Sequence, residues 1–88
     1  MELYNPNSGM IPDQQQGIMP SKKEIEALKV GDFVKIGIYS GYGVTFIFAN
    51  IHKIENGTFT GCAWDGIEGI IDKGAFFEFG ADNIFYIC

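Results

Sequence analysis

Hydrophobic and polar positions follow a period of two in residues 33–39, which is the period of β-strands. In residues 33–39 every second side chain is a branched aliphatic one, at Val34, Ile36 and Ile38. Residues 44–51 are apolar on both parities, which predicts a strand that is covered on both faces or contains a bulge. Apolar runs in residues 75–79 and 84–88 predict two more short strands.

The clearest turn signal is Asn56-Gly57, which stands between two β-forming runs. Both central residues of a type I′ turn need positive φ, and Asn followed by Gly tolerates this best. A two-residue loop also sets the register, which pairs Glu55 with Thr58, Ile54 with Phe59, Lys53 with Thr60, Ile51 with Cys62 and Ala49 with Trp64. In this register Ile54 and Phe59 lie on one face of the hairpin, whereas Ile51, Cys62, Ala49 and Trp64 lie on the other face. A one-residue bulge or a sharp bend reconciles them, and we expect it at Gly61.

One short helix is predicted before the first strand. Ser21 can cap it, and Glu24 follows at the spacing of a capping box. Ile25 and Leu28 then lie three residues apart on one face, and Gly31 ends the segment. We expect about two turns of helix that are stable only when packed on the sheet.

The remaining segments are predicted to lack regular strands and helices. Residues 1–19 show no sustained period, so they form a flexible tail or a strap over the domain or a neighbouring subunit. Residues 65–74 are a connection rich in Gly, and residues 80–83 are a tight turn or a single 3₁₀ turn. Residues 20–88 thus form a single domain of the mainly β class, a small, partly open barrel of five strands with one short N-terminal helix.

Three segments carry a resemblance to a known class of domain: residues 28–36, which open a strand, the Asn56-Gly57 turn, and residues 81–84 before the last strand. Together they resemble the SH3-like small β-barrel domains of bacterial and phage proteins, over residues 28–88. The aromatic groove and acidic loop of peptide-binding SH3 domains have no residue-by-residue counterpart, so no site follows from the resemblance. An oligonucleotide-binding barrel is the rival fold, and it would require a helix in residues 65–74.

Charge and composition narrow the function classes. The net charge is −5, with 11 acidic residues against 6 basic ones, and every basic residue is Lys. An acidic chain without Arg is poorly suited to nucleic acid, which needs a basic surface. Because the two cysteines make no disulfide framework, and no signal peptide or membrane-length apolar run is present, we expect a cytoplasmic protein that does not enter a membrane.

No residue set suggests an enzyme. His52 is the only histidine, and its expected neighbour across the hairpin, Gly61, offers no ligand or carboxylate. Cys62 is expected to be a small buried hydrophobe, and Cys88 to pack at the end of the last strand. We therefore expect no catalytic residue.

Cofactor and metal motifs are absent as well. The acidic residues of the Gly-rich connection do not have EF-hand spacing: Asp65, Glu68 and Asp72. The glycines near the first turn are not followed by the Lys-Ser/Thr pair of a phosphate loop, so they are interpreted as turn glycines: Gly37, Gly41 and Gly43. We expect no metal and no cofactor.

The aromatic residues carry the functional hypothesis. The chain has 8 Phe, 4 Tyr and 1 Trp, more rings than the interior of so small a barrel holds. If Phe46, Phe48, Phe59, Phe77 and Phe79 point inward, then Tyr39, Tyr42, Trp64, Phe76 and Phe85 cannot all do so. Exposed aromatic patches mark interfaces.

We therefore predict a non-enzymatic interaction module that binds a protein partner or its own copy, with Tyr39, Tyr42 and Trp64 as the binding residues. The alternative is an acidic inhibitor of the immunity or phage anti-host type, which docks on a basic enzyme surface. That alternative rests on the net charge of −5, which would steer the protein toward a basic partner.

Overall fold

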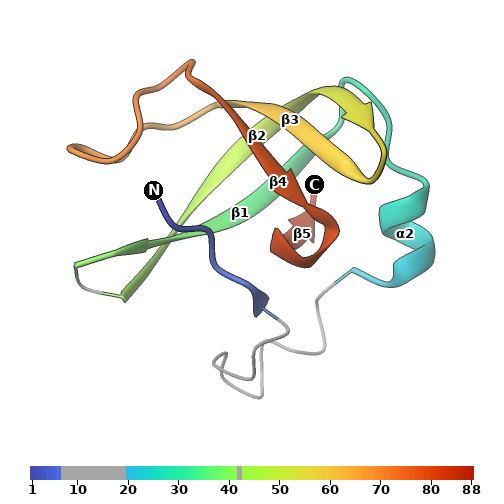
Figure 1. Cartoon of the computed structure of the whole chain (residues 1–88), viewed down its shortest axis with the longest axis horizontal. Coiled ribbons are helices and arrows are strands. Elements are labelled where there is room, and N and C mark those ends of the chain that lie inside the picture. Colours follow the sequence, from blue (N-terminus) through green and yellow to red (C-terminus); the bar gives the residue numbers. More distant parts are fainter. Residues whose placement is uncertain (7–19, 42) are drawn as a thin grey trace.

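Five antiparallel strands make one sheet, in the order β4-β3-β2-β1-β5 (Figure 1). The structure is a computed structural model, and it describes residues 1–6, 20–41 and 43–88. The elements are α2 (Lys22–Glu26), β1 (Phe33–Ser40), β2 (Gly43–Glu55), β3 (Thr58–Ala63), β4 (Phe76–Gly80), the 3₁₀ turn η2 (Ala81–Asn83) and β5 (Ile84–Ile87). The sheet is not closed, since β4 and β5 are its two edges. The mainly β class with five strands and one short helix is confirmed.

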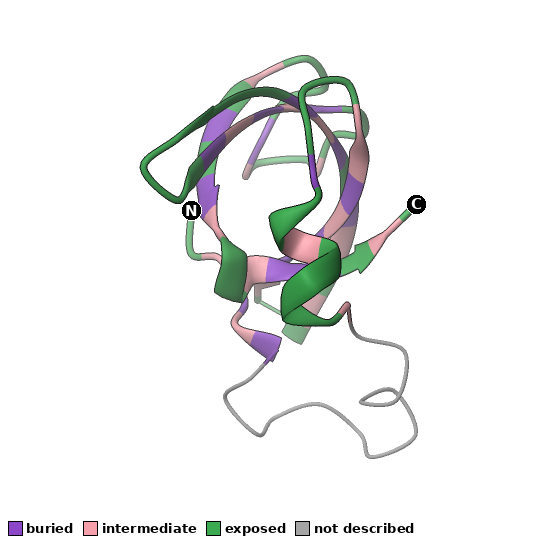
Figure 2. Cartoon of the chain, turned by 90° about the vertical axis from the view of Figure 1, so that its right-hand side faces the viewer, coloured by how far each residue is buried: buried purple, intermediate pink, exposed green. Residues whose placement is uncertain are grey.

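The sheet curls around a core on one side, here called the inner face (Figure 2). The alternation predicted for β1 is confirmed, because Val34, Ile36 and Ile38 are each 0% exposed. The largest cluster of buried side chains consists of Leu28, Val34, Ile36, Ile38, Ile47, Ala49, Ile51, Phe59, Ala63, Ile71, Phe77, Phe79 and Ile84. Side chains of the other parity lie on the opposite side of the sheet, here called the outer face.

The hairpin of β2 and β3 turns at Asn56-Gly57, where φ is 52° and 80°. The predicted register holds for the pairs next to the turn, from Glu55 with Thr58 to Lys53 with Thr60. It then shifts between Ile51 and Lys53, so the extra residue of the bulge is His52 on β2.

The bulge expected at Gly61 is therefore on the wrong strand, and the outer pairs move by one residue. Asn50 lies opposite Cys62, and Ile51 lies opposite Gly61. Gly61 instead makes room for its neighbours, since a Cβ at this position would lie 2.8 Å from Cε1 of Phe79 and 3.2 Å from Cβ of Ala49. A strand glycine marks either a bulge or a close approach, and here it permits a close approach.

The helix α2 begins with the predicted capping box. The Glu24 amide donates to Oγ of Ser21 at 3.2 Å, and the Ser21 amide donates to Oε1 of Glu24 at 2.9 Å. With five residues the helix is shorter than the two turns expected, because its C-cap is already at Ala27. Ile25 and Leu28 pack against the core. The helix α2 lies beside the hairpin end of the sheet (Figure 1). Within the described part of the chain, no helix has the length and apolar character needed to cross a membrane.

Residues 1–6, here called the strap, lie against β1. The Tyr4 amide donates to the Gly37 carbonyl at 2.8 Å, and the Tyr39 amide donates to the Glu2 carbonyl at 2.9 Å. Leu3 forms an isolated antiparallel bridge with Ile38 between these bonds. The strap thus continues the edge that β5 begins farther along β1. Residues 7–19, the remainder of the predicted tail or strap, lie outside the described residues.

Candidate functional site

The strand register places large side chains side by side across the outer face. Lys35 of β1 lies between Phe48 of β2 and Tyr86 of β5. The amide of Trp64, which follows β3, donates to the Phe48 carbonyl at 2.8 Å. One row of the outer face therefore runs from β5 through β1 and β2 to the end of β3.

A second row lies next to the first. Phe33 of β1 lies opposite Asn50, and Cys62, the next residue across, lies opposite Phe76 of β4. The Phe33 ring meets the Trp64 ring edge-on, with centroids 5.1 Å apart, and so joins the two rows. We call the rings of both rows the aromatic face: Phe33, Phe48, Trp64, Phe76 and Tyr86.

The aromatic face is open to solvent. The exposed fractions are 37% for Phe48, 55% for Trp64, 62% for Phe76 and 43% for Tyr86. The Nζ atom of Lys35 lies 5.6 Å from the centroid of the Phe48 ring, within the range of a cation–π contact. The face is therefore apolar with one cation near its centre.

Toward the strap, the outer face remains aromatic but is covered. Tyr4 is only 2% exposed and Phe85 only 4%. The Tyr4 ring lies edge-on to Tyr39 at 5.7 Å and to Phe46 at 6.2 Å, and Phe46 packs on Phe85 at 4.6 Å. This covered end accounts for Val44 and Phe46, which pack against Tyr4 and Phe85, whereas Phe48 is exposed on the aromatic face. Only part of the apolar run in residues 44–51 is therefore packed on both faces of the sheet.

The residues predicted as a binding site lie in different places. Trp64 is exposed on the aromatic face, whereas Tyr39 is half-buried against Tyr4 at the covered end. Tyr42 lies outside the described residues. The structure therefore does not bring Tyr39 and Trp64 into one patch.

Two rings expected inside are on the outer face. Phe46 belongs to the covered end and Phe48 to the aromatic face, because the bulge at His52 reverses the parity that the hairpin turn alone would impose on β2. Phe33 and Tyr86 of the aromatic face were not among the predicted binding residues. The signal for Phe33 was present, since it has the parity opposite to the buried residues of β1.

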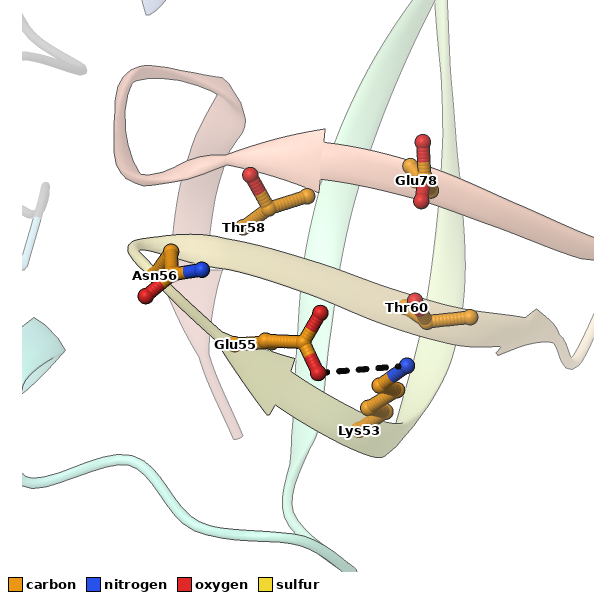
Figure 3. A pocket seen from close by; sticks show the side chains of 6 residues that line it. All are labelled: Lys53, Glu55, Asn56, Thr58, Thr60 and Glu78. Atoms are coloured by element: carbon orange, nitrogen blue, oxygen red, sulfur yellow. Dashed lines mark ion pairs between the residues drawn. The ribbon is translucent and has the colours of Figure 1, made fainter.

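A polar hollow adjoins the aromatic face at the hairpin end (Figure 3). The ammonium of Lys53 lies 3.4 Å from Oε2 of Glu55, and both side chains are largely exposed, so this ion pair contributes little to stability. The side chains lining the hollow come from β2, the turn, β3 and β4: Lys53, Glu55, Asn56, Thr58, Thr60 and Glu78. The hollow forms a polar rim for the apolar face.

Potential metal ligands do not cluster in the part of the chain that the structure describes. In residues 1–6, 20–41 and 43–88, no three His, Cys, Asp or Glu side chains are placed to hold a metal ion. His52 is exposed and meets the Phe76 ring edge-on at 5.1 Å. Both thiols are free, and Cys62 donates to the Gly74 carbonyl at 3.5 Å. Comparison of the chain with protein-family models, with curated proteins and with solved structures found no match.

The Tyr4 phenol makes the covered end sensitive to high pH. Burial raises the pKa of this phenol above its ordinary value of 10.0, and the neighbouring Tyr39 phenol raises it further. Because the folded-state pKa is the higher one, ionisation of this phenol does not affect the free energy of unfolding below pH 10, and it lowers that free energy as the pH rises from 10 through the folded-state pKa.

We expect the alkaline unfolding midpoint, followed by circular dichroism, to move to higher pH in Tyr4→Phe. The phenylalanine ring has no proton to lose, so the linkage disappears. Tyr86→Phe is the matched control, because Tyr86 is 43% exposed, and it should leave the midpoint in place. An equal shift in both variants would contradict the assignment to Tyr4.

Proposed function

We propose that this chain is a non-enzymatic interaction module that binds a protein partner or a second copy of itself through the aromatic face. One observation carries the proposal: large rings are exposed side by side on the outer face while other side chains fill the inner face. Covering apolar surface contributes about 25 cal/mol per Å², and aromatic residues are enriched in the cores of interfaces.

The surroundings of the face suit this role. Lys35 supplies one cation among the rings, which can pair with a carboxylate of a partner. Thr60 and Glu78 of the polar hollow lie beyond the rings and provide a hydrated rim. An apolar centre with a polar rim is the usual anatomy of a protein interface.

We further infer an SH3-like barrel as the fold that presents this face. The strand order β4-β3-β2-β1-β5 and the 3₁₀ turn between β4 and β5 support that assignment. A cytoplasmic location belongs to the same proposal, because the free thiols of Cys62 and Cys88 suit a reducing compartment.

The test compares Trp64→Ala with Val30→Ala. Val30 is 61% exposed, much like Trp64, but precedes β1 and is not part of the aromatic face. Sedimentation velocity over a range of concentrations measures self-association. A protein captured from cell extract on the immobilised wild-type chain is then purified and titrated against each variant. Trp64 is the only tryptophan, so its fluorescence reports directly on coverage of the face.

We expect Trp64→Ala to weaken the association by about tenfold or more, because Trp is enriched among interface hot spots and Trp64 is 55% exposed on this face. Val30→Ala should change the dissociation constant by less than about twofold. Equal affinity of the two variants, or a wild-type chain that stays monomeric and whose Trp64 fluorescence does not respond to the captured protein, would refute the proposal.

A further inference from the structure

The strap occupies a groove beside β1 in the manner of a bound peptide. Its contacts are backbone hydrogen bonds at Glu2 and Tyr4, and the Tyr4 carbonyl accepts a third bond from Nδ2 of Asn83 at 3.2 Å. Asn83 is held for this by the Gly80 amide, which donates to its Oδ1 at 2.9 Å. An extended segment that pairs with a strand edge and inserts one side chain is a common mode of peptide recognition.

Gly37 forms the floor of the pocket that takes the Tyr4 side chain. A Cβ at Gly37 would lie 2.9 Å from Cβ and 2.9 Å from Cδ2 of Tyr4, and also 2.9 Å from Cγ1 of Val44. The chain therefore has no side chain on the outer face at the point where the ring of the strap lies. Rings of Tyr39 and Phe46 stand edge-on around it.

Tyr4 is an imperfect occupant of this pocket. Its side chain is 2% exposed, yet its hydroxyl has no hydrogen-bond partner among the described residues. A buried hydroxyl without a partner loses its hydration and gains nothing in return. A ring without the hydroxyl keeps the packing and avoids that loss, so it should bind roughly fivefold to hundredfold more tightly.

We propose that this groove is a binding site for an extended segment of another protein that has phenylalanine in the place of Tyr4, and that the strap is its replaceable occupant. The pairing edge of Gly37 and Tyr39 supplies sequence-independent affinity, and the pocket selects the ring. A second copy of the chain is a poorer occupant, because it brings the same phenol. This site differs from the aromatic face, so it goes beyond the function proposed above.

The experiment uses the full-length chain with Tyr4→Ala, which empties the pocket and leaves Gly37 in place. Three synthetic peptides of residues 1–6 are titrated into it: the natural one, one with Tyr4→Phe and one with Tyr4→Ala. Amide chemical shifts of Gly37, Tyr39 and Phe85 report on the groove, and the Trp64 amide reports on the aromatic face.

We expect the Tyr4→Phe peptide to bind at least about fivefold more tightly than the natural one, and the Tyr4→Ala peptide to show no saturable binding. Adding Gly37→Ala to the host should abolish binding of every peptide, because the new methyl group fills the pocket. Equal affinity of the Phe and Tyr peptides, or shifts that centre on Trp64, would overturn the proposal.

A second measurement applies even if Tyr4→Ala does not fold. The full-length Tyr4→Phe chain should melt at a higher temperature than the wild type, because its strap no longer buries an unpartnered hydroxyl. The wild-type chain should bind the Tyr4→Phe peptide more weakly than the emptied host does, since its own strap competes. A lower melting temperature for Tyr4→Phe would show that the phenol fits the pocket, and would overturn the proposal.

Discussion

Replacing Phe79 with alanine is expected to lower the free energy of unfolding by about 3–5 kcal/mol. Phe79 is 3% exposed, and its ring stacks on that of Phe59 with centroids 5.4 Å apart and planes 9° apart. The Phe77 ring packs on the Phe79 ring as well, with centroids 5.5 Å apart. Truncation removes these contacts and leaves a cavity beside Gly61. Chemical denaturation followed by circular dichroism measures the change.

Phe76→Ala is the matched control for Phe79→Ala. The two residues share a type and the strand β4, but Phe76 is 62% exposed on the outer face, so its loss should cost less than about 1 kcal/mol. Gly61→Ala tests the mechanism, because its Cβ would lie 2.8 Å from Cε1 of Phe79. It should destabilise the wild type and cost less in Phe79→Ala, where only the 3.2 Å approach to Cβ of Ala49 and the 3.4 Å approach to the Asn50 carbonyl remain. Additive effects of the two substitutions would contradict the close contact with Phe79.

Gly37→Ala is expected to detach the strap and to cost about 1–3 kcal/mol of stability, the usual range for overpacking. The new Cβ would lie 2.9 Å from Tyr4 and 2.9 Å from Val44, and both are fixed by the sheet or by backbone hydrogen bonds. Hydrogen exchange checks the result. The Tyr4 and Tyr39 amides, which bond to Gly37 and Glu2, should lose protection while those in the centre of β2 keep it.

Gly41→Ala serves as the control for Gly37→Ala. A Cβ at Gly41 meets nothing within 4 Å, so this substitution should leave stability and exchange nearly unchanged. Tyr4→Ala introduced into the Gly37→Ala chain should cost little, because the ring has already left its pocket. A full additional loss from that second substitution would show that Tyr4 stays seated despite the alanine.

Structural features that depend only on residues close together in the sequence were predictable. The Asn56-Gly57 turn, the capping box of Ser21 with Glu24 and the alternation of β1 all appear as expected. Each depends on φ preferences, on hydrogen bonds between residues three apart or on the two-residue repeat of a strand. Such interactions need no knowledge of distant parts of the chain.

Features that depend on distant residues were not predictable in the same way. The bulge was expected at Gly61 because glycine weakens a strand, but the register shift lies at His52. Gly37 was interpreted as a turn glycine, whereas it lies within β1 and makes room for Tyr4. In both cases the same residue type serves two purposes, and only the packed neighbour decides between them.

The candidate site shows the same division. The surplus of rings over interior room was visible in the composition, and Trp64 is indeed exposed at 55%. The other exposed rings could not be predicted, because the bulge at His52 places Phe48 on the outer face beside Lys35. The strap, which comes from the N-terminal end of the chain and contacts Tyr39, determined which rings are covered.

By itself the sequence determined the class of this protein: a small acidic β-domain with one tight hairpin, one capped helix and more aromatic rings than its core can hold. The tertiary structure alone decided which rings are open and which are covered. The physical reason is that local preferences set backbone conformation within a few residues. The exposure of each ring depends on which strands pair and in which register, and on where Tyr4 of the strap packs on β1.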